Sequence, residues 1–196
     1  IAYCFDSVAG YSSFGSYTGN GSTDTTAGIT ASTFGIGEYA SSNGAAASID
    51  NNNSTLTWFL ATTGPGGLKY DYGSGVTKTI NYVRCSAGQT ENMTNMSIKG
   101  SNDDSSYTTL NSDDSPVLEG GNVASGVFNI NYTFNNTTAY RYYKIEFTQT
   151  TGNYPKFVEV ELIEAPVITT GFKPAFVMVK NTGTGARPWV IFNGTR

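Results

Sequence analysis

Residues 140–148 read YRYYKIEFT, and apolar and polar side chains alternate along them. Tyr143, Ile145 and Phe147 take every second position, and polar side chains such as Lys144 lie between them. Successive side chains of a β-strand point to opposite faces, so this period of two predicts a strand with one dry face. The same period recurs along the chain, which predicts an all-β protein.

Two longer segments repeat this alternation. In residues 157–163 (FVEVELI), Val158, Val160 and Leu162 are expected in the core, and the glutamates between them on a solvated face. Residues 126–134 (GVFNINYTF) have a dry face that holds Phe128, Ile130, Tyr132 and Phe134. Shorter strands are expected at 68–72, 96–100, 107–110, 176–180 and 189–192, and turn-rich clusters at 62–67, 102–106, 111–115 and 150–153. Many short strands without a helix indicate a sandwich or jelly roll.

Composition and charge exclude several classes of function. The net charge is -4 and the basic residues form no stripe, which argues against a nucleic-acid partner. No apolar run is long enough for membrane insertion. The chain has no histidine, which removes Ser-His and Cys-His nucleophiles and most zinc sites. Paired acids such as Asp103 and Asp104, or Glu159 and Glu161, are expected to be solvated, so we predict that the chain is not an enzyme.

The two cysteines, Cys4 and Cys85, allow at most one internal disulfide. Cys85 ends an alternating run at residues 79–85, where a buried free thiol is the simpler interpretation. A disulfide between the two stays open as the alternative. Two cysteines are too few for a cysteine-based metal site.

Five segments carry motifs whose order resembles discoidin-like domains, also called coagulation factor 5/8 type C domains. The opening AAASIDNNNSTLTW (45–58) is similar to A-x-D-G-N-x-x-T-x-W, with one extra residue before the tryptophan. The others are GLKYDYG (67–73), IKGSNDDSSYTTL (98–110), YRYYKI (140–145) and VEVEL (158–162). Tyr107 takes a position where tryptophan is common, and the closing cysteine pair is missing. The resemblance implies a discoidin-like jelly-roll sandwich over residues 26–164.

The flanking segments resemble a different family. SVAGYSSFGSYTGNGSTD (7–24) and TGFKPAFVMVK (170–180) are similar to a repeat of phage tail-fibre and virion-surface proteins, itself similar to concanavalin-like lectins. This implies that residues 1–25 and 165–196 are discontinuous pieces of a second, incomplete β-sandwich into which the discoidin-like domain is inserted. The alternative is that both flanks are linker strands of one larger sheet.

The discoidin-like resemblance also implies a structural Ca²⁺ in the turn after the opening aspartate. By position, its ligands are Asp50, Asn52 or Asn53, Thr55 and the distant Glu159. Hard oxygen ligands of this kind are what Ca²⁺ accepts. The alternative is that Asp50 and the asparagine run form only an Asx-type turn.

The family places its ligand on loops at one end of the jelly roll. Lectin sites combine aromatic faces with a few charged or amide groups, so the candidates for binding a sugar are Phe34, Tyr39, Arg84 and Tyr154. Trp58 is expected in the core. Arg84 has a second interpretation, in which it lies along its strand and pairs with a carboxylate.

Together these features predict a non-catalytic carbohydrate-binding or adhesion module of an extracellular or virion-surface fibre protein. Its partners would be cell-surface or extracellular glycans, and weak repeated sites favour a homo-oligomer or fibre assembly. The alternative function is a purely structural fibre or shell subunit, glycosylated at its N-x-S/T triplets, which assembles through sheet edges without binding sugar.

Overall fold

The computed structural model describes residue 9 and residues 23–88, 93–111, 130–149, 154–164, 176–180 and 189–193. The chain divides into one unit of Gly21–Ala165 and a second of Ile1–Asn20 with Pro166–Arg196. In the second unit, β11 (Phe176–Lys180) and β12 (Trp189–Asn193) pair antiparallel, at the two places where short strands were predicted. Thr23 and Asp24, which the prediction placed in the first flank, form a short strand that pairs with residues 163–164 of the larger unit. The other predictions for the flanks, Cys4 and Phe128 lie outside the described residues.

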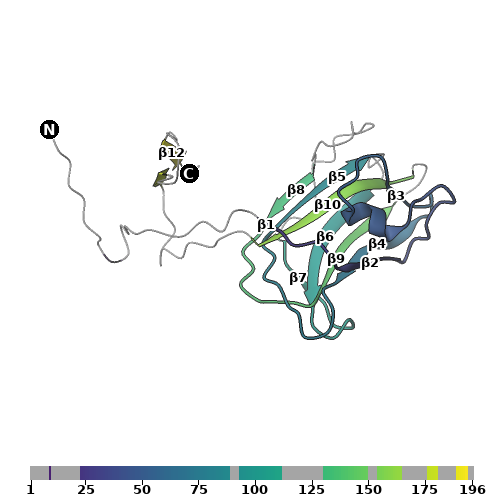
Figure 1. Cartoon of the computed structure of the whole chain (residues 1–196), viewed down its shortest axis with the longest axis horizontal. Coiled ribbons are helices and arrows are strands. Elements are labelled where there is room, and N and C mark those ends of the chain that lie inside the picture. The colour runs from purple at the N-terminus through teal and green to yellow at the C-terminus, as the bar shows by residue number, and fades with distance from the viewer. Residues whose placement is uncertain are drawn as a thin grey trace. The chain divides into compact units, whose positions relative to one another are not determined.

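The larger unit consists of two antiparallel sheets that enclose one core (Figure 1). The first, here called the β10 sheet, has the order β1 (Thr23–Asp24), β10 (Lys156–Glu164), β5 (Tyr82–Gly88), β8 (Ile130–Thr133), with β3 (Thr57–Trp58) also paired to β10. The second, the β9 sheet, has the order β2 (Thr30–Phe34), β4 (Gly64–Asp71), β9 (Tyr142–Gln149), β6 (Met93–Ser101), β7 (Thr108–Thr109). The predicted all-β sandwich is confirmed.

The inner faces follow the period-two pattern of the sequence on β9. On β10 a register shift between Phe157 and Glu159 interrupts the pattern, so the core cluster holds Phe157, Val160 and Leu162 where Val158, Val160 and Leu162 were predicted. Tyr143, Ile145 and Phe147 of β9 are fully buried, as the alternation predicted. The ring of Phe147 stacks on that of Phe157 from β10, with centroids 5.9 Å apart, and meets Phe59 edge-on at 5.3 Å. Each such side chain contributes about 1.5–3 kcal/mol on burial. This aromatic contact joins the two sheets inside the sandwich.

Two local features differ from the sequence prediction. Residues 62–67 were expected to form a turn, but β4 already begins at Gly64. Gly67 has φ 155°, and an added Cβ would lie 1.9 Å from the Ile145 carbonyl oxygen. The lack of a side chain at this position therefore allows β4 to approach its neighbouring strand closely. The chain also forms a five-residue 3-10 helix, η1 (Ala45–Ile49), where no helix was predicted. No helix among the described residues is long and apolar enough to cross a membrane.

The outer face of β10 is the main correction. Glu159 and Glu161 were expected on a solvated face, but they are only 4% and 9% exposed. The cause is tertiary: η1 packs against β10, the turn after η1 lies near Glu159, and Arg84 of β5 lies against Glu161. Cys85 on the neighbouring β5 is a buried free thiol, in agreement with the simpler interpretation. Burial raises the pKa of this thiol well above its ordinary value.

Candidate functional site

Three aromatic rings meet at one end of the sandwich. The ring centroids of Tyr39 and Trp58 are 4.5 Å apart, those of Tyr39 and Tyr154 are 5.0 Å apart, and those of Trp58 and Tyr154 are 6.3 Å apart. Tyr154 is 36% exposed, and the other two are half-buried. We call these three residues the aromatic cluster. It unites both tyrosines that the sequence predicted as sugar contacts.

Backbone hydrogen bonds hold the three segments of the cluster together. The N–H of Tyr39 donates to the Trp58 carbonyl oxygen at 2.7 Å. Beside it, the N–H of Phe59 donates to the Pro155 carbonyl oxygen at 2.9 Å. These bonds tie a loop, strand β3 and the start of β10 into one rigid frame, although they are distant in sequence.

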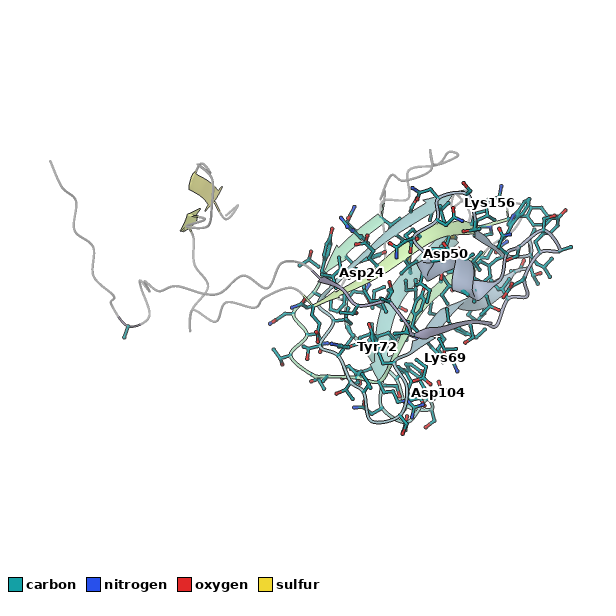
Figure 2. All side chains as sticks on the ribbon, in the orientation of Figure 1. Asp24, Asp50, Lys69, Tyr72, Asp104 and Lys156 are labelled. Carbon is teal, nitrogen blue, oxygen red and sulfur yellow. The ribbon has the colours of Figure 1, made fainter. Side chains whose placement is uncertain are left out.

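Lys156 adds a positive charge to the aromatic cluster. It is the antiparallel partner of Trp58 across β3 and β10, and its Nζ lies 4.2 Å from the centroid of the Trp58 ring (Lys156 is labelled in Figure 2). A cation over an indole face is attracted by the ring quadrupole. No sequence pattern had pointed to Lys156, because only the β3–β10 pairing brings it to the cluster.

Trp58 differs from its expected place in the core. Its ring is half-buried and packs between the two tyrosines and Lys156 rather than against the fully buried phenylalanines. Its Nε1–H is buried and has no hydrogen-bond partner among the described residues. β3 holds only two residues and pairs with the first two of β10, so Trp58 stays at the margin of the sheet.

The structure does not bring Arg84 or Phe34 to the aromatic cluster. Arg84 Nε donates to Glu161 Oε2 at 2.5 Å, the ion pair given by its second sequence interpretation. Glu161 lies five positions along β10 from Lys156, which is roughly 16 Å at the rise of a strand. Phe34 lies on the β9 sheet, where Lys144 Nζ is 4.7 Å from its ring centroid.

The turn after η1 forms the Asx-type arrangement that the sequence left open. Asp50 Oδ1 accepts the backbone N–H of Asn52 at 2.9 Å, and Asp50 Oδ2 accepts the Thr55 hydroxyl at 2.7 Å. Asn53 is exposed in the same turn. Asp50, Asn52 and Thr55 are therefore in direct contact, in a turn that the chain reaches between Tyr39 and Trp58.

Glu159 is the distant acid of the predicted calcium set, and it faces this turn. Neither of its carboxylate oxygens has a hydrogen-bond partner among the described residues. Burial raises the pKa of Glu159 to about 7, and the negative charge of Asp50 adds to the rise. A buried carboxylate without a partner beside a second carboxylate is costly unless a cation or proton joins it. No group of three or more His, Cys, Asp or Glu side chains that could hold a metal occurs in the described part of the chain.

The sequence profile of the F5/8 type C domain matches residues 28–160, more than half of the chain. The chain belongs to the F5/8 type C domain family. A second profile, a domain of unknown function named DUF7483, matches residues 1–32. No curated protein matches the chain in sequence.

Solved structures share the fold of this F5/8 type C domain. A family 32 carbohydrate-binding module of Clostridium perfringens NanJ, in complex with galactose, is 16% identical with a TM-score of 0.52, and the match covers 73% of this chain and 98% of that one. The C. perfringens module CpGH89CBM32-5, in complex with GalNAc-β-1,3-galactose, is 15% identical with a TM-score of 0.51, covering 69% and 95%. Chitosan-binding module 1 from a chitosanase/glucanase of Paenibacillus sp. IK-5 is 17% identical with a TM-score of 0.51, covering 71% and 98%.

Proposed function

We propose that this F5/8 type C domain is a non-catalytic carbohydrate-binding module that takes its sugar at the aromatic cluster. The observation that carries the proposal is the convergence of Tyr39, Trp58 and Tyr154 at one end of the sandwich, with Lys156 beside them. Aromatic faces pack against the C–H surfaces of sugars, and a cation donates to hydroxyl or carboxylate oxygens. The fold shared with modules solved in complex with galactose and GalNAc-β-1,3-galactose also supports it.

A Ca²⁺ ion at the Asp50 turn is part of the same proposal. The buried, unpartnered carboxylate of Glu159 next to Asp50 fits a hard cation, as do the oxygens of Thr55 and Asn52. When bound, the ion would neutralise both carboxylates. The turn is tied to the loop of the aromatic cluster, because Thr57 Oγ1 donates to the Gly44 carbonyl oxygen at 2.9 Å.

The wider setting of the module is proposed as an extracellular or virion-surface fibre protein of phage type. The support is the resemblance of residues 7–24 and 170–180 to tail-fibre repeats. Such a fibre would present many copies of the module and gain avidity from weak sites. Sedimentation of the purified chain tests this, because an assembled species is expected and a strict monomer would contradict it.

The deciding experiment is a glycan-array measurement on the purified chain in Ca²⁺ and, in parallel, in EDTA. We expect selective binding that Tyr154→Ala removes and that Tyr82→Ala leaves intact, since Tyr82 is a half-buried tyrosine of β5 bonded to Asn131. Loss of binding in EDTA would support the calcium role, and equal binding in both buffers would remove it. A folded chain that binds no glycan would contradict the proposal and favour the structural-subunit alternative.

A further inference from the structure

Three lysines form a row on the outer face of the β9 sheet. Lys69 of β4 is the antiparallel partner of Lys144 of β9, and Lys144 is in turn the partner of Lys99 of β6. Their strand neighbours Tyr70, Tyr143 and Ile98 are fully buried on the inner face, so the lysines project outward. We call Lys69, Lys144 and Lys99 the lysine row.

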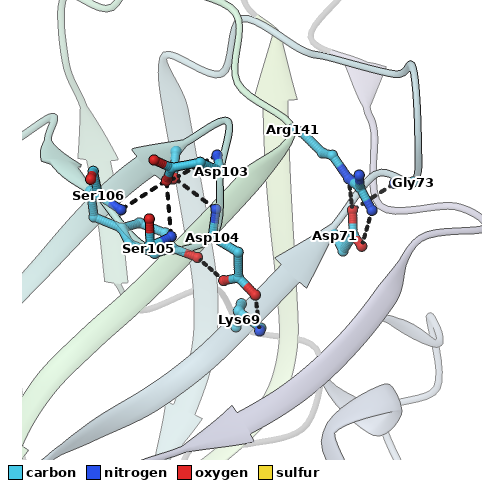
Figure 3. Close-up of polar contacts among 10 residues, drawn as sticks. Lys69, Asp71, Gly73, Asp103, Asp104, Ser105, Ser106 and Arg141 are labelled. Carbon is cyan, nitrogen blue, oxygen red and sulfur yellow. Dashed lines mark hydrogen bonds and ion pairs between the residues drawn. The ribbon is translucent and has the colours of Figure 1, made fainter.

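These three aligned positive charges need local compensation. Like charges directly opposite each other on neighbouring strands are destabilising. The outer two lysines are compensated: Lys69 Nζ lies 2.7 Å from Asp104 Oδ2, and Lys99 pairs with Glu146 (Figure 3 shows Lys69 and Asp104). Lys144, in the middle, has no ion pair with a carboxylate in the described part of the chain.

Aromatic rings hold the central lysine instead. Lys144 Nζ is 3.8 Å from the ring centroid of Tyr107 and 4.7 Å from that of Phe34. Tyr107 is fixed by its hydroxyl, which donates to Asp104 Oδ1 at 2.5 Å. The rings position the ammonium group by cation–π attraction but do not neutralise it. Lys69 lowers the pKa of Asp104 most, and Lys144 also helps to lower it but forms no ion pair with Asp104, so the Lys144 ammonium group can still contact an external anion.

The distance between the lysines of the row indicates the size of ligand that could contact them together. Lys69 and Lys99 are two strand spacings apart, roughly 10 Å. A ligand that reaches more than one lysine must be extended and carry repeated negative charge. Nucleic acid suits the surface less, because its dense phosphates favour a broad basic footprint and this chain has a net charge of -4.

We propose that the lysine row is a second ligand surface of the module, which binds an extended anionic polysaccharide with Lys144 as its central contact. The surface is distinct from the aromatic cluster, since Figure 2 shows Lys156 well separated from Lys69 and Asp104. The proposal does not depend on sugar binding at the cluster. Because the lysines are half-exposed, the affinity falls as salt is added.

The test measures binding of the full chain to polygalacturonate, dextran sulfate and neutral dextran by affinity electrophoresis at low and high salt. The intact chain is expected to bind the acidic polymers only, and the preferred one assigns carboxylate or sulfate as the ligand group. Lys144→Glu is expected to weaken this binding about tenfold, the loss of one charged hydrogen bond. The new carboxylate would lie between Lys69 and Lys99, which favours folding of the variant.

The matched control is Lys78→Glu, because Lys78 is also half-exposed but pairs with Glu164 at the end of β10 and is not part of the lysine row. It should change binding less than twofold, about the effect of a remote charge. Tyr154→Ala should spare the acidic polymers, which separates this proposal from the aromatic cluster. Three outcomes would overturn it: no binding of either acidic polymer, unchanged binding by Lys144→Glu together with loss in Lys156→Glu, or tighter capture of duplex DNA than of the polysaccharides.

Discussion

Strands β9 and β10 both alternate apolar and charged residues, yet their outer faces differ in exposure to water. On β9, Glu146 pairs with Lys99 and its side chain is 29% exposed. On β10, Glu161 pairs with Arg84 and its side chain is 11% exposed, and Glu159 has no partner among the described residues. The period of two, interrupted on β10 by the register shift after Phe157, decides which side chains leave the core. Whether they then reach water depends on which distant segment covers the strand.

Substitutions on the inner faces of β9 and β10 should change the free energy of unfolding most. Phe147→Ala on β9 and Phe157→Ala on β10 should each lower the free energy of unfolding by about 3–5 kcal/mol, because both rings are fully buried and stack on each other. Tyr142→Ala, on the outer face of β9, should cost less than about 1 kcal/mol. Urea unfolding measures all three. A small effect of Phe157→Ala would mean that β10 does not contribute to the core as described.

The pH dependence of stability near neutral pH should come from Glu159 on β10. In the metal-free folded chain, the pKa of Glu159 is about 7, whereas in the unfolded chain the ordinary pKa of 4.5 applies. The folded state therefore binds more protons between these values, and the free energy of unfolding falls as pH rises through the window. The total change is about 3 kcal/mol. Urea unfolding in EDTA at pH 4.5 and pH 8 measures it, and a flat profile would contradict the burial of Glu159.

Glu159→Gln and Glu146→Gln should change stability in opposite directions, because Glu159 is buried on β10 and Glu146 is partly exposed on β9. In EDTA at pH 8, Glu159→Gln should raise the free energy of unfolding by about 2 kcal/mol, because it removes a buried charge. Glu146→Gln removes a half-exposed ion pair and should lower it by less than about 1 kcal/mol. Under the calcium proposal, adding Ca²⁺ raises the melting temperature of the unaltered chain but not of Glu159→Gln. An equal rise in both would remove Glu159 from the site.

The two ion pairs give the smallest expected difference. Arg84→Gln leaves the more buried carboxylate of Glu161 without its partner and should cost about 2 kcal/mol. Lys99→Gln leaves Glu146 partly in water and should cost less than about 1 kcal/mol. Equal costs in urea unfolding would show that the cover over β10 leaves Glu161 as solvated as Glu146.

Local pattern predicted the strands well where one face is dry. Residues 140–148 and 157–163 lie almost entirely within β9 and β10, because alternation is a property of the strand itself. It failed at Gly64–Gly67, where glycine usually indicates a turn but here permits close strand approach. It also gave no sign of η1, which packs against β10 and β2.

The candidate site was predicted only in part, for a similar reason. Tyr39 and Tyr154 follow from residue type and loop position, whereas Trp58 and Lys156 enter the cluster through the pairing of β3 with β10. Arg84 has the right chemistry, but its place on β5 directs it to Glu161. Residue type reduces the number of candidate binding residues, but only the strand register shows which of them lie together in the aromatic cluster.

The sequence by itself determined the all-β class, the inner faces of the main strands and the F5/8 type C family, because these depend on alternation and on the order of short motifs. The tertiary structure decided the burial of Glu159, the aromatic cluster and the alignment of Lys69, Lys144 and Lys99. Each of these is a contact between segments far apart in the chain. Such contacts are set by sheet register and by the segments that cover each sheet, and no local pattern encodes either.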